Sequence, residues 1–494
     1  MAEEKSILSS FETVDSQDPE YVFDERTKKY WTKNSAGQWI FIPETSFRRH
    51  LRSKGKAAAI AKDDKDAVLS EIDAILEATE LDNRVSYAGP LAGHWSGFKT
   101  VCGNPILVTE DPELIQPEKP RDDADTLPDG GTLCDITDCR GWPTLGQLIK
   151  NLLSHEDVGD VQVIRYLGYV AHILDCLYSD KQSRIIALMI AGERECGKTL
   201  LFNDIHSVLF GGKIGKPYDY MIGKDSFNDD FLPSVLLTID DEVNNTHMDA
   251  RVALGERSKK MVANSSHKIR GMHKSGFTLN PLWALTIMCN DEPANLMILP
   301  PLEEDNKDKF LIMKAYKKRM PMPAETVAER ERFWATLRAE LPRFVWWIRN
   351  EWQTPREIQG RFGVKFWHHP VVIEDLMKLS PAWSIWEYLE RTIFQDCNCY
   401  PDPRKPGETF SGYEWMGTAS DLRVYLSDTT FRDDGSSPRP RLTQEEGRKV
   451  PISQWLGKRL TELADKFPDN VRNIRTNKAR YWHIIAPESD GSDG

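Results

Sequence analysis

The sequence predicts an α/β domain with a largely parallel sheet, and two observations support this prediction. Three apolar runs, at residues 184–192, 235–239 and 283–289, have the length and composition of strands that are buried on both faces. Helix-like stretches separate the three runs, as parallel strands require, because parallel strands cannot be joined by a tight turn. We therefore expect one central sheet in the middle of the chain.

The composition is that of a globular protein with several domains. The chain has 494 residues, of which 40% are hydrophobic and 28% are charged, enough to bury a full core in about three domains. It has no apolar run of about 18 residues, and its acidic, polar start does not match a secretory signal. The eight cysteines match no zinc-ligand spacing. We expect reduced thiols, an intracellular location and no membrane partner.

The chain divides by composition into seven segments, with hairpin and helix signals near the start. Residues 21–48 alternate aromatic and polar positions around a Ser-Ala-Gly turn, which predicts a β-hairpin, and residues 56–78 look helical. The predicted order is a disordered tail at 1–20, an α+β region at 21–110, a Pro- and Gly-containing linker at 111–140, a helical collar at 141–182, the α/β core at 183–325, a helical region at 326–380 and a C-terminal domain at 381–488.

A phosphate-binding loop is predicted at Gly192–Thr199, where GERECGKT matches G-x-x-x-x-G-K-[ST]. The loop follows a predicted buried strand and precedes a predicted helix, so successive N–H groups and the helix N-terminus can face phosphate. Lys198 would neutralise the β- and γ-phosphates, and Thr199 would offer its hydroxyl to Mg²⁺. The predicted ligands are ATP and Mg²⁺. The residues expected to contact the nucleotide are Gly192, Glu195, Cys196, Gly197, Lys198, Thr199 and Leu200.

Acidic residues follow the second apolar run. Asp240, Asp241 and Glu242 come directly after it, and Asp240 lies 42 residues after Lys198. Carboxylates at a strand end beside the loop would hold Mg²⁺ through ordered water and orient the attacking water. We assign Asp240 to the metal and leave the base open between Asp241 and Glu242. The alternative is an acidic turn after a strand.

The third apolar run ends at Asn290. A polar side chain there can contact the γ-phosphate or the lytic water from an adjacent strand, and the alternative is a turn or cap asparagine before Pro293. Given the other two motifs, we predict a functional role for Asn290.

The net charge of −12 does not favour general attraction to nucleic acid, so DNA binding requires a local basic patch. Residues 251–274 contain seven Lys and Arg residues against Glu256 alone, a local charge of +6. Part of this stretch could form a hairpin with its turn at Gly271 and grip single-stranded phosphates without reading sequence. A solvated basic face is the alternative. The candidate DNA-contacting residues are Lys259, Lys260, Lys268, Arg270, His273 and Lys274.

The order of these motifs resembles the superfamily 3 helicases, and more closely the phage, plasmid and poxvirus-type primase-helicase proteins. The resemblance is specific over about 180–320 and looser over 20–110 and 380–488. It implies an AAA+ type P-loop ATPase core in a homo-oligomeric ring, usually a hexamer, whose subunits complete one another's ATP sites. Carried over, Gly192–Thr199 is Walker A and Asp240–Glu242 is Walker B.

The same resemblance assigns further roles along the chain. Asn290 becomes the sensor, and Lys260, Arg270 and Lys274 fall in a region that contacts single-stranded DNA. The family places an arginine finger some 15–25 residues after the sensor, whereas this chain has Lys307 and Lys309 there and no arginine before Arg319. The resemblance therefore implies Lys309 in this catalytic role, as a point charge and not a fork.

The C-terminal segment resembles a winged-helix domain, with helix signals at 418–427 and 452–466 before a predicted strand pair. Such a domain could bind replication-origin DNA, although a structural or oligomer-contact role is equally open. The basic residues near its wing would be Arg472, Arg475, Lys478 and Arg480. The N-terminal region shows no primase signature.

The implied function is an ATP-dependent DNA helicase of a phage, prophage or mobile element, acting in replication in the cytoplasm of a bacterial host. It would hydrolyse ATP to translocate on single-stranded DNA. Two other functions stay open. One is a P-loop ATPase that remodels proteins or acts in defence without unwinding, and the other is an origin-binding protein in which ATP only drives assembly.

Overall fold

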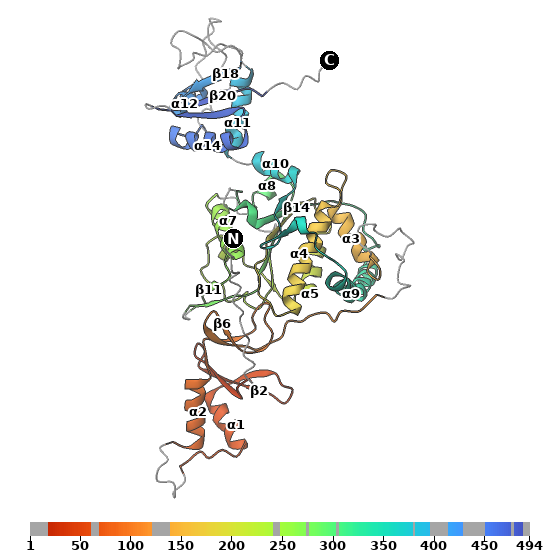
Figure 1. The fold of residues 1–494 in the computed structure, drawn as a ribbon, viewed down its shortest axis with the longest axis vertical. Coiled ribbons are helices and arrows are strands. Elements are labelled where there is room, and N and C mark those ends of the chain that lie inside the picture. The colour runs from red at the N-terminus through yellow and green to blue at the C-terminus, as the bar shows by residue number, and fades with distance from the viewer. Residues whose placement is uncertain are drawn as a thin grey trace, which may run out of the picture. The chain divides into compact units, whose positions relative to one another are not determined.

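The computed structural model divides the chain into two compact units, residues 1–372 and 373–494 (Figure 1). The structure describes residues 18–60, 69–120, 139–240, 248–272, 276–302, 306–378, 381–395, 413–427, 450–475 and 479–487. Residues 1–17 of the predicted tail and 121–138 of the predicted linker therefore lie outside the described residues.

A six-stranded parallel sheet lies at the centre of the first unit. Its order is β17-β14-β8-β13-β10-β9, and every strand pair in it is parallel. The strands are β8 (Ala187–Gly192), β9 (Ile214–Gly215), β10 (Leu236–Ile239), β13 (Ala284–Asn290), β14 (Phe310–Ala315) and β17 (Trp367–His368). The prediction of an α/β core with a parallel sheet is confirmed.

Helices cover this sheet, and their apolar faces supply most of the surrounding core. α3 (Pro143–Leu153) and α4 (Val161–Tyr178) pack against each other and against α9 (Val327–Asn350), as Figure 1 shows. Glu340 of α9 accepts the backbone N–H groups of the first turn of α3, at 3.1 and 2.8 Å. A carboxylate suits this place because helix N-termini attract negative charge.

Between β8 and β17, the helices other than α9 are short, with one exception. A π-helical stretch, η1 (Leu200–Ile205), and α5 (His206–Leu209) follow the predicted phosphate loop. The longer helix in this part of the chain is α7 (Met248–Ala263). The others are α6 (Tyr218–Met221), α8 (Pro293–Leu296), η2 (Lys307–Lys309) and η3 (Arg356–Ile358).

His206, at the start of α5, is fully buried, and its burial predicts a pH dependence of stability. Its Nε2 lies 3.0 Å from the Tyr166 hydroxyl, and burial lowers its pKa from 6.5 to about 3. Below pH 6.5 this histidine is protonated in the unfolded chain but stays neutral in the folded chain. The free energy of unfolding therefore falls as pH falls from 6.5 toward 3. We expect a loss of about 2 kcal/mol in the free energy of unfolding between pH 7 and pH 5.

Urea denaturation of wild type and His206→Phe at both pH values measures this effect. The variant should lose most of that pH dependence, whereas His155→Gln, at an exposed position, should keep it. An equal pH dependence in wild type and His206→Phe would contradict the assignment.

Two small sheets and two helices form the N-terminal part of the first unit. The first sheet has the order β3-β2-β1-β4 and packs on the helices, and the second has the order β5-β7-β6. The elements are β1 (Tyr21–Asp24), β2 (Lys29–Lys33), β3 (Trp39–Ile42), α1 (Glu44–Ser53), α2 (Glu71–Asp82), β4 (Arg84–Val85), β5 (Tyr87–Gly89), β6 (Gly97–Val101) and β7 (Asn104–Val108).

The structure differs from the sequence prediction over residues 56–78. The β2–β3 hairpin turns at Gly37, within the predicted Ser-Ala-Gly turn. The helix, however, begins only at Glu71, after Ser70 accepts a hydrogen bond from the Asp73 N–H as its N-cap. Residues 54–60 are not helical. The Ser70 hydroxyl satisfies a backbone N–H of the first helical turn, so it fixes the start of the helix at Glu71.

Short strands outside the predicted core complete the first unit. β15 (Gln359–Gly360) and β16 (Gly363–Val364) form a hairpin. β17 joins the central sheet beside β14, although it lies beyond residue 325, where the sequence placed the end of the core. Its two residues carry no periodicity, so sequence pattern could not reveal it. Helix α10 (Pro370–Lys378) then spans the division between the two units.

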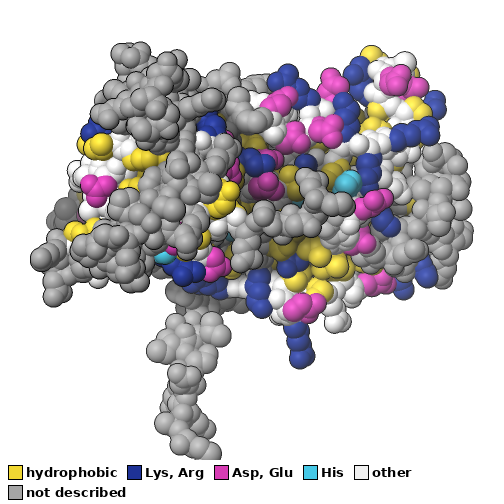
Figure 2. Space-filling model, turned by 90° about the horizontal axis from the view of Figure 1, so that it is seen from above, with side chains coloured by type: hydrophobic (Ala, Val, Ile, Leu, Met, Phe, Trp, Pro, Cys, Tyr) yellow, Lys and Arg dark blue, Asp and Glu magenta, His cyan; other side chains and the backbone are white. Residues whose placement is uncertain are grey.

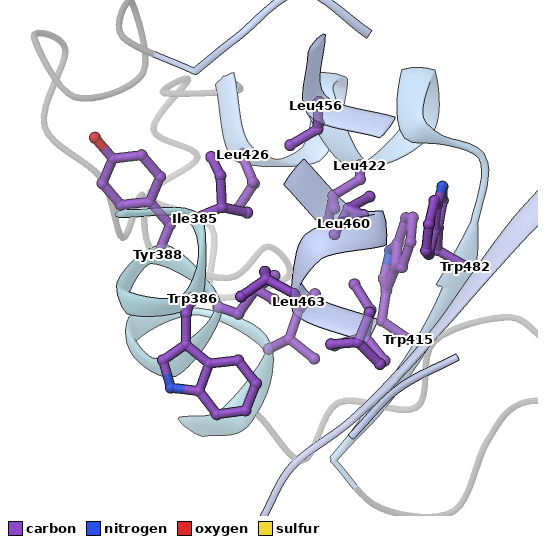
Figure 3. Close-up of a cluster of buried hydrophobic side chains, with 14 of the residues drawn as sticks. Ile385, Trp386, Tyr388, Trp415, Leu422, Leu426, Leu456, Leu460, Leu463 and Trp482 are labelled. Carbon is purple, nitrogen blue, oxygen red and sulfur yellow. The ribbon is translucent and has the colours of Figure 1, made fainter. Parts of the chain in front are cut away.

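The second unit has its own three-stranded sheet and hydrophobic core. The sheet order is β18-β20-β19. In Figure 3, Leu460 and Leu463 lie between Trp386 and Trp415 in this core. The elements are α11 (Pro381–Arg391), η4 (Ile393–Gln395), β18 (Glu414–Gly417), α12 (Ala419–Ser427), α14 (Ser453–Lys466), β19 (Val471–Arg475) and β20 (Arg480–Ile485).

Two general expectations can be compared with the described residues. No described helix is long and apolar enough to cross a membrane. Five cysteines lie in the described part of the chain, and all five are free thiols, with only Cys102 exposed.

Candidate nucleotide-binding site

The predicted phosphate loop begins where β8 ends, and Gly192 is fixed there by packing. A Cβ atom on Gly192 would lie 2.4 Å from the carbonyl oxygen of Ala315, at the end of the neighbouring strand β14. Register pairs Ala315 with Gly192 on one side and Asn290 with Gly192 on the other. Only glycine lets the three strand ends meet so closely.

The loop backbone between Gly192 and Lys198 has the shape of an anion-binding concavity. Glu195 and Gly197 have positive φ values of 57° and 100°, and turns that mix left- and right-handed residues point successive N–H groups to one side. The Glu195 side chain is 89% exposed and lies 3.7 Å from Lys317. Cys196 is buried, which raises the pKa of its thiol. The loop therefore fits a phosphate through its backbone.

Lys198 is the buried cation of the loop. Only 8% of the residue is exposed. Its Nζ donates to the carbonyl oxygens of Gly192 and Glu193, at 2.7 and 2.8 Å, and to Oδ1 of Asn290 at 3.1 Å. An ammonium group has three protons, so these acceptors use all of them. The loop lysine is held beside the end of β13.

Asn290 is the last residue of β13, and the structure brings it to the loop as the sequence hypothesis required. The backbone N–H of the next residue, Asp291, donates to the Gly192 carbonyl at 3.2 Å. A second link joins the same segments, because Arg194 forms an ion pair of 3.0 Å with Glu292. Asn290 is therefore part of the loop's hydrogen-bond network and is not simply a turn residue.

The acidic strand end lies one strand farther from the loop than the sequence suggested. β13 lies between β8 and β10 in the sheet, so β10 is about 10 Å from β8, given a strand spacing of about 4.8 Å. Asp240 directly follows β10 and forms an ion pair of 2.5 Å with Lys216. Asp241 and Glu242 lie outside the described residues. The acids therefore do not follow the strand next to β8, and the assignment of Asp240 to the metal stays a prediction.

Two described side chains near the loop carry oxygen atoms of the kind that bind Mg²⁺. Thr199 is exposed beside the loop, and about a third of the Asp240 side chain is exposed. Hydroxyl and carboxylate oxygens are ligands that Mg²⁺ accepts together with phosphate and water. Among the residues that the structure describes, no group of three or more His, Cys, Asp or Glu side chains could hold a metal alone.

Two lysines at the carboxyl end of β14 also lie near the loop, and the sequence did not predict this. Lys314 Nζ lies 3.9 Å from Asp291, next to Asn290. Lys317 reaches Glu195 of the loop. Their strand was not among the three predicted, so no sequence signal placed these lysines at the loop.

Lys309 lies at the opposite end of β14 from the loop. It directly precedes the strand, whose last residue pairs with Gly192. Its side chain is 10% exposed and forms an ion pair with Asp308. The same Asp308 binds the guanidinium of Arg361 at 2.5 Å, and that arginine is 58% exposed. The structure therefore places an exposed arginine beside the lysine that was assigned as a finger.

The basic stretch 251–274 consists of two different elements. Arg251 on α7 is buried and donates to the Leu299 carbonyl at 3.1 Å. Arg257 donates to the backbone of Tyr220, so these two arginines hold the fold together. Lys259 is half-buried on the same helix. Lys260 is exposed and lies 3.9 Å from Glu256.

The second element is the predicted hairpin. β11 (His267–Ile269) pairs antiparallel with β12 (Phe277–Leu279). Lys268 and Arg270 are exposed on either side of the buried Ile269. His273 and Lys274 lie outside the described residues. On the face drawn in Figure 2, basic and acidic side chains are interspersed among the described residues, so DNA attraction depends on local patches.

The C-terminal basic residues lie on β19, β20 and their surroundings. Arg475 faces Arg480 across the β19–β20 pair. Arg480 donates to Oγ1 of Thr461 at 3.1 Å, and Arg472 lies 3.6 Å from Asp469. Lys478 lies outside the described residues.

Comparison with known proteins adds a distant structural likeness. No family model and no curated protein matches the sequence. Two apo structures of the NrS-1 C terminal region share 11% and 12% identity with TM-scores of 0.48 and 0.47, over 94% of this chain and 96% of theirs. A JCV Helicase structure with a bound acetamide compound shares 13% identity with a TM-score of 0.24, over 48% of this chain and 65% of that one. The function must therefore be argued from the site.

The fold and the predicted site occur together in one part of the chain. The chain is a mixed α/β protein whose parallel sheet is consistent with a P-loop-like core. Its glycine loop, buried lysine and adjacent asparagine meet at the carboxyl edge of that sheet, where ligands bind in open α/β folds.

Proposed function

We propose that this chain is an ATP-dependent DNA helicase that hydrolyses ATP to translocate on single-stranded DNA. The contact of 3.1 Å between Lys198 Nζ and Asn290 Oδ1 is the observation that supports it best. It joins the lysine proposed to bind phosphate to a polar side chain that could contact the γ-phosphate.

The chain's own residues would carry out the phosphate chemistry. Lys198 would exchange its carbonyl partners for β- and γ-phosphate oxygens, and the loop N–H groups would hold the phosphate chain in place. Thr199 and Asp240 would hold Mg²⁺, which supplies charge neutralisation of the phosphates. Asn290, released from Lys198, would orient the attacking water. Asp241 or Glu242 would accept the proton from that water.

DNA would bind to the exposed lysines and arginines of α7 and the β11–β12 hairpin. Lys268 and Arg270 are exposed there and would contact phosphates without reading bases. The proposal includes a homo-oligomeric ring, a hexamer, in which Arg361 or Lys309 reaches the neighbouring ATP site. The second unit would bind origin DNA, and the protein would act in the host cytoplasm for a phage or mobile element.

The decisive experiment measures ATP hydrolysis with and without single-stranded DNA, together with sizing of the assembly with and without nucleotide. We expect strong stimulation by DNA and a multi-subunit ring. In the double variant Lys268→Ala with Arg270→Ala, stimulation should fall about tenfold while hydrolysis without DNA persists, because the lost contacts are to the DNA backbone. Lys213→Ala, which breaks only a surface ion pair with Glu110, is the matched control.

A monomer whose hydrolysis ignores DNA would refute the helicase proposal and favour an ATPase that remodels proteins or acts in defence. A ring that binds origin DNA but does not hydrolyse ATP would favour an assembly switch instead. Either outcome would leave the nucleotide site itself in place.

A further inference from the structure

The basic hairpin is held at its first strand by a buried asparagine. Asn228 is 2% exposed. Its backbone N–H donates to the Arg270 carbonyl at 3.0 Å, and its Oδ1 accepts the Arg270 N–H at 2.7 Å. Its Nδ2 donates to the Lys268 carbonyl at 3.0 Å. The backbone on both sides of Ile269 is therefore fixed, and with it the directions of Lys268 and Arg270.

The residue after this asparagine connects the hairpin to the N-terminal sheets. Asp229 accepts a hydrogen bond of 2.7 Å from Arg26, which lies in the turn between β1 and β2. The two side chains are only 7% (Arg26) and 16% (Asp229) exposed. The Arg26 guanidinium also lies 4.9 Å above the ring of Phe277, on the second hairpin strand. One N-terminal arginine thus contacts the second hairpin strand and also the residue next to Asn228, which holds the first strand.

Gly271 shows how tightly these parts fit. A Cβ atom there would lie 2.1 Å from Oδ2 of Asp229 and 2.3 Å from Nη2 of Arg26. The residue that follows Arg270 therefore packs directly on the ion pair. A side chain at this position would displace the ends of the Asp229 and Arg26 side chains.

Further contacts from the N-terminal sheets support the second hairpin strand. Tyr87 of β5 stacks on Phe277, with ring centroids 5.6 Å apart. Asn104 of β7 donates to the Thr278 carbonyl at 3.4 Å. The hairpin is a separate two-stranded sheet and does not pair with the central one. These contacts and those of Asn228 support its position.

We propose that the N-terminal sheets act as a brace for the basic hairpin, and that Arg26 is a positioning residue for Lys268 and Arg270. The DNA part of this inference rests on the proposed function, whereas the bracing itself does not. Loss of Arg26 removes its ion pair with Asp229 and its contact with Phe277. The hairpin then loses its fixed direction while the central sheet and the ATP loop stay intact.

Hydrogen exchange tests the brace without any DNA. In Arg26→Ala and Asp229→Ala, amide exchange should accelerate in residues 266–280 and stay unchanged in β8 and β13, because local opening follows lost contacts. Arg84→Ala is the matched control, since it breaks an exposed pair with Glu25 in the same part of the fold. Unchanged exchange in the hairpin of both variants would overturn the proposal.

Binding and hydrolysis test the positioning role on the full-length protein. With a fluorescent oligo-dT strand, Arg26→Ala should bind about tenfold more weakly, with a smaller salt dependence, because fewer phosphates are contacted. ATP hydrolysis without DNA should stay within about twofold of wild type. Arg26→Lys keeps the charge but loses the planar fork, so it should recover only part of the affinity.

Two further outcomes separate this inference from the proposed function. If Arg26→Ala loosens the hairpin but leaves oligo-dT binding unchanged, the positioning role is wrong. If the Lys268→Ala, Arg270→Ala variant also binds oligo-dT normally, the DNA-binding role proposed for these two residues is wrong. The hydrogen-exchange experiment alone then tests whether the N-terminal sheets hold the hairpin. Equal loss of basal hydrolysis and DNA binding in Arg26→Ala would overturn the proposal, because it would show general damage to the fold.

Discussion

Lys198→Ala should abolish ATP hydrolysis, with a fall in kcat of about 10³-fold, because it removes the buried cation that would face the transferring phosphate. The lysine is held at this place by three oxygen acceptors from the loop and from Asn290. Alanine supplies none of these hydrogen bonds and no charge. Affinity for ATP should fall as well. A steady-state phosphate-release assay, with nucleotide affinity measured separately, distinguishes the two effects.

Lys213→Ala is the matched control for this variant, because it removes an equal charge from a surface ion pair. It should leave hydrolysis within about twofold of wild type, since exposed pairs contribute little. Both variants should unfold at similar urea concentrations. Normal hydrolysis by a folded Lys198→Ala protein would mean that the loop is not the catalytic phosphate site, and the motor proposal would fail with it.

The strands of the core were predictable from the sequence because they are buried on both faces. The runs at 184–192, 235–239 and 283–289 are almost entirely apolar, and each overlaps a strand of the structure, although β13 extends one residue farther, to Asn290. Continuous burial is a local property that a sequence displays directly. The phosphate loop was predictable for the same reason, since its glycines and its lysine are adjacent in the chain.

The order of these strands was not predictable, because pairing joins residues that are far apart in the chain. β13 lies between β8 and β10, which brings Asn290 to Lys198 and places Asp240 one strand away. Strands as short as β9 and β17 have no periodic signal at all. The contact between Arg361 and Asp308 spans 53 residues, so a search for an arginine by spacing could not find it.

The basic stretch 251–274 shows that a count of charged residues does not reveal which of them are exposed. The sequence shows seven basic residues between 251 and 274, but Arg251 and Arg257 serve as internal hydrogen-bond donors. Arg26, which no motif marks, is the arginine that contacts the hairpin from outside. The number of charges in a segment therefore does not give the charge that faces solvent.

Gly192→Ala should lower the free energy of unfolding by about 3 kcal/mol, because overpacking against rigid neighbours is costly. The added Cβ atom would lie 2.4 Å from the Ala315 carbonyl oxygen and 2.8 Å from the Ala315 Cβ atom. Neither neighbour can rotate away, since both belong to a central strand. The strand ends must separate, and this moves the Gly192 carbonyl that accepts hydrogen bonds from Lys198 and Asp291. ATP affinity should fall together with stability.

Gly37→Ala provides the comparison that isolates this mechanism. Gly37, unlike Gly192, has a positive φ, of 78°, and nothing lies within 4 Å of its Cβ position in the β2–β3 turn. Alanine there costs only the local backbone strain, about 1 kcal/mol, and hydrolysis should be unaffected. Urea denaturation and ATP titration of both variants give the test. If the two substitutions destabilise equally and both variants bind ATP normally, the close contact of β8 with β14 does not shape the loop.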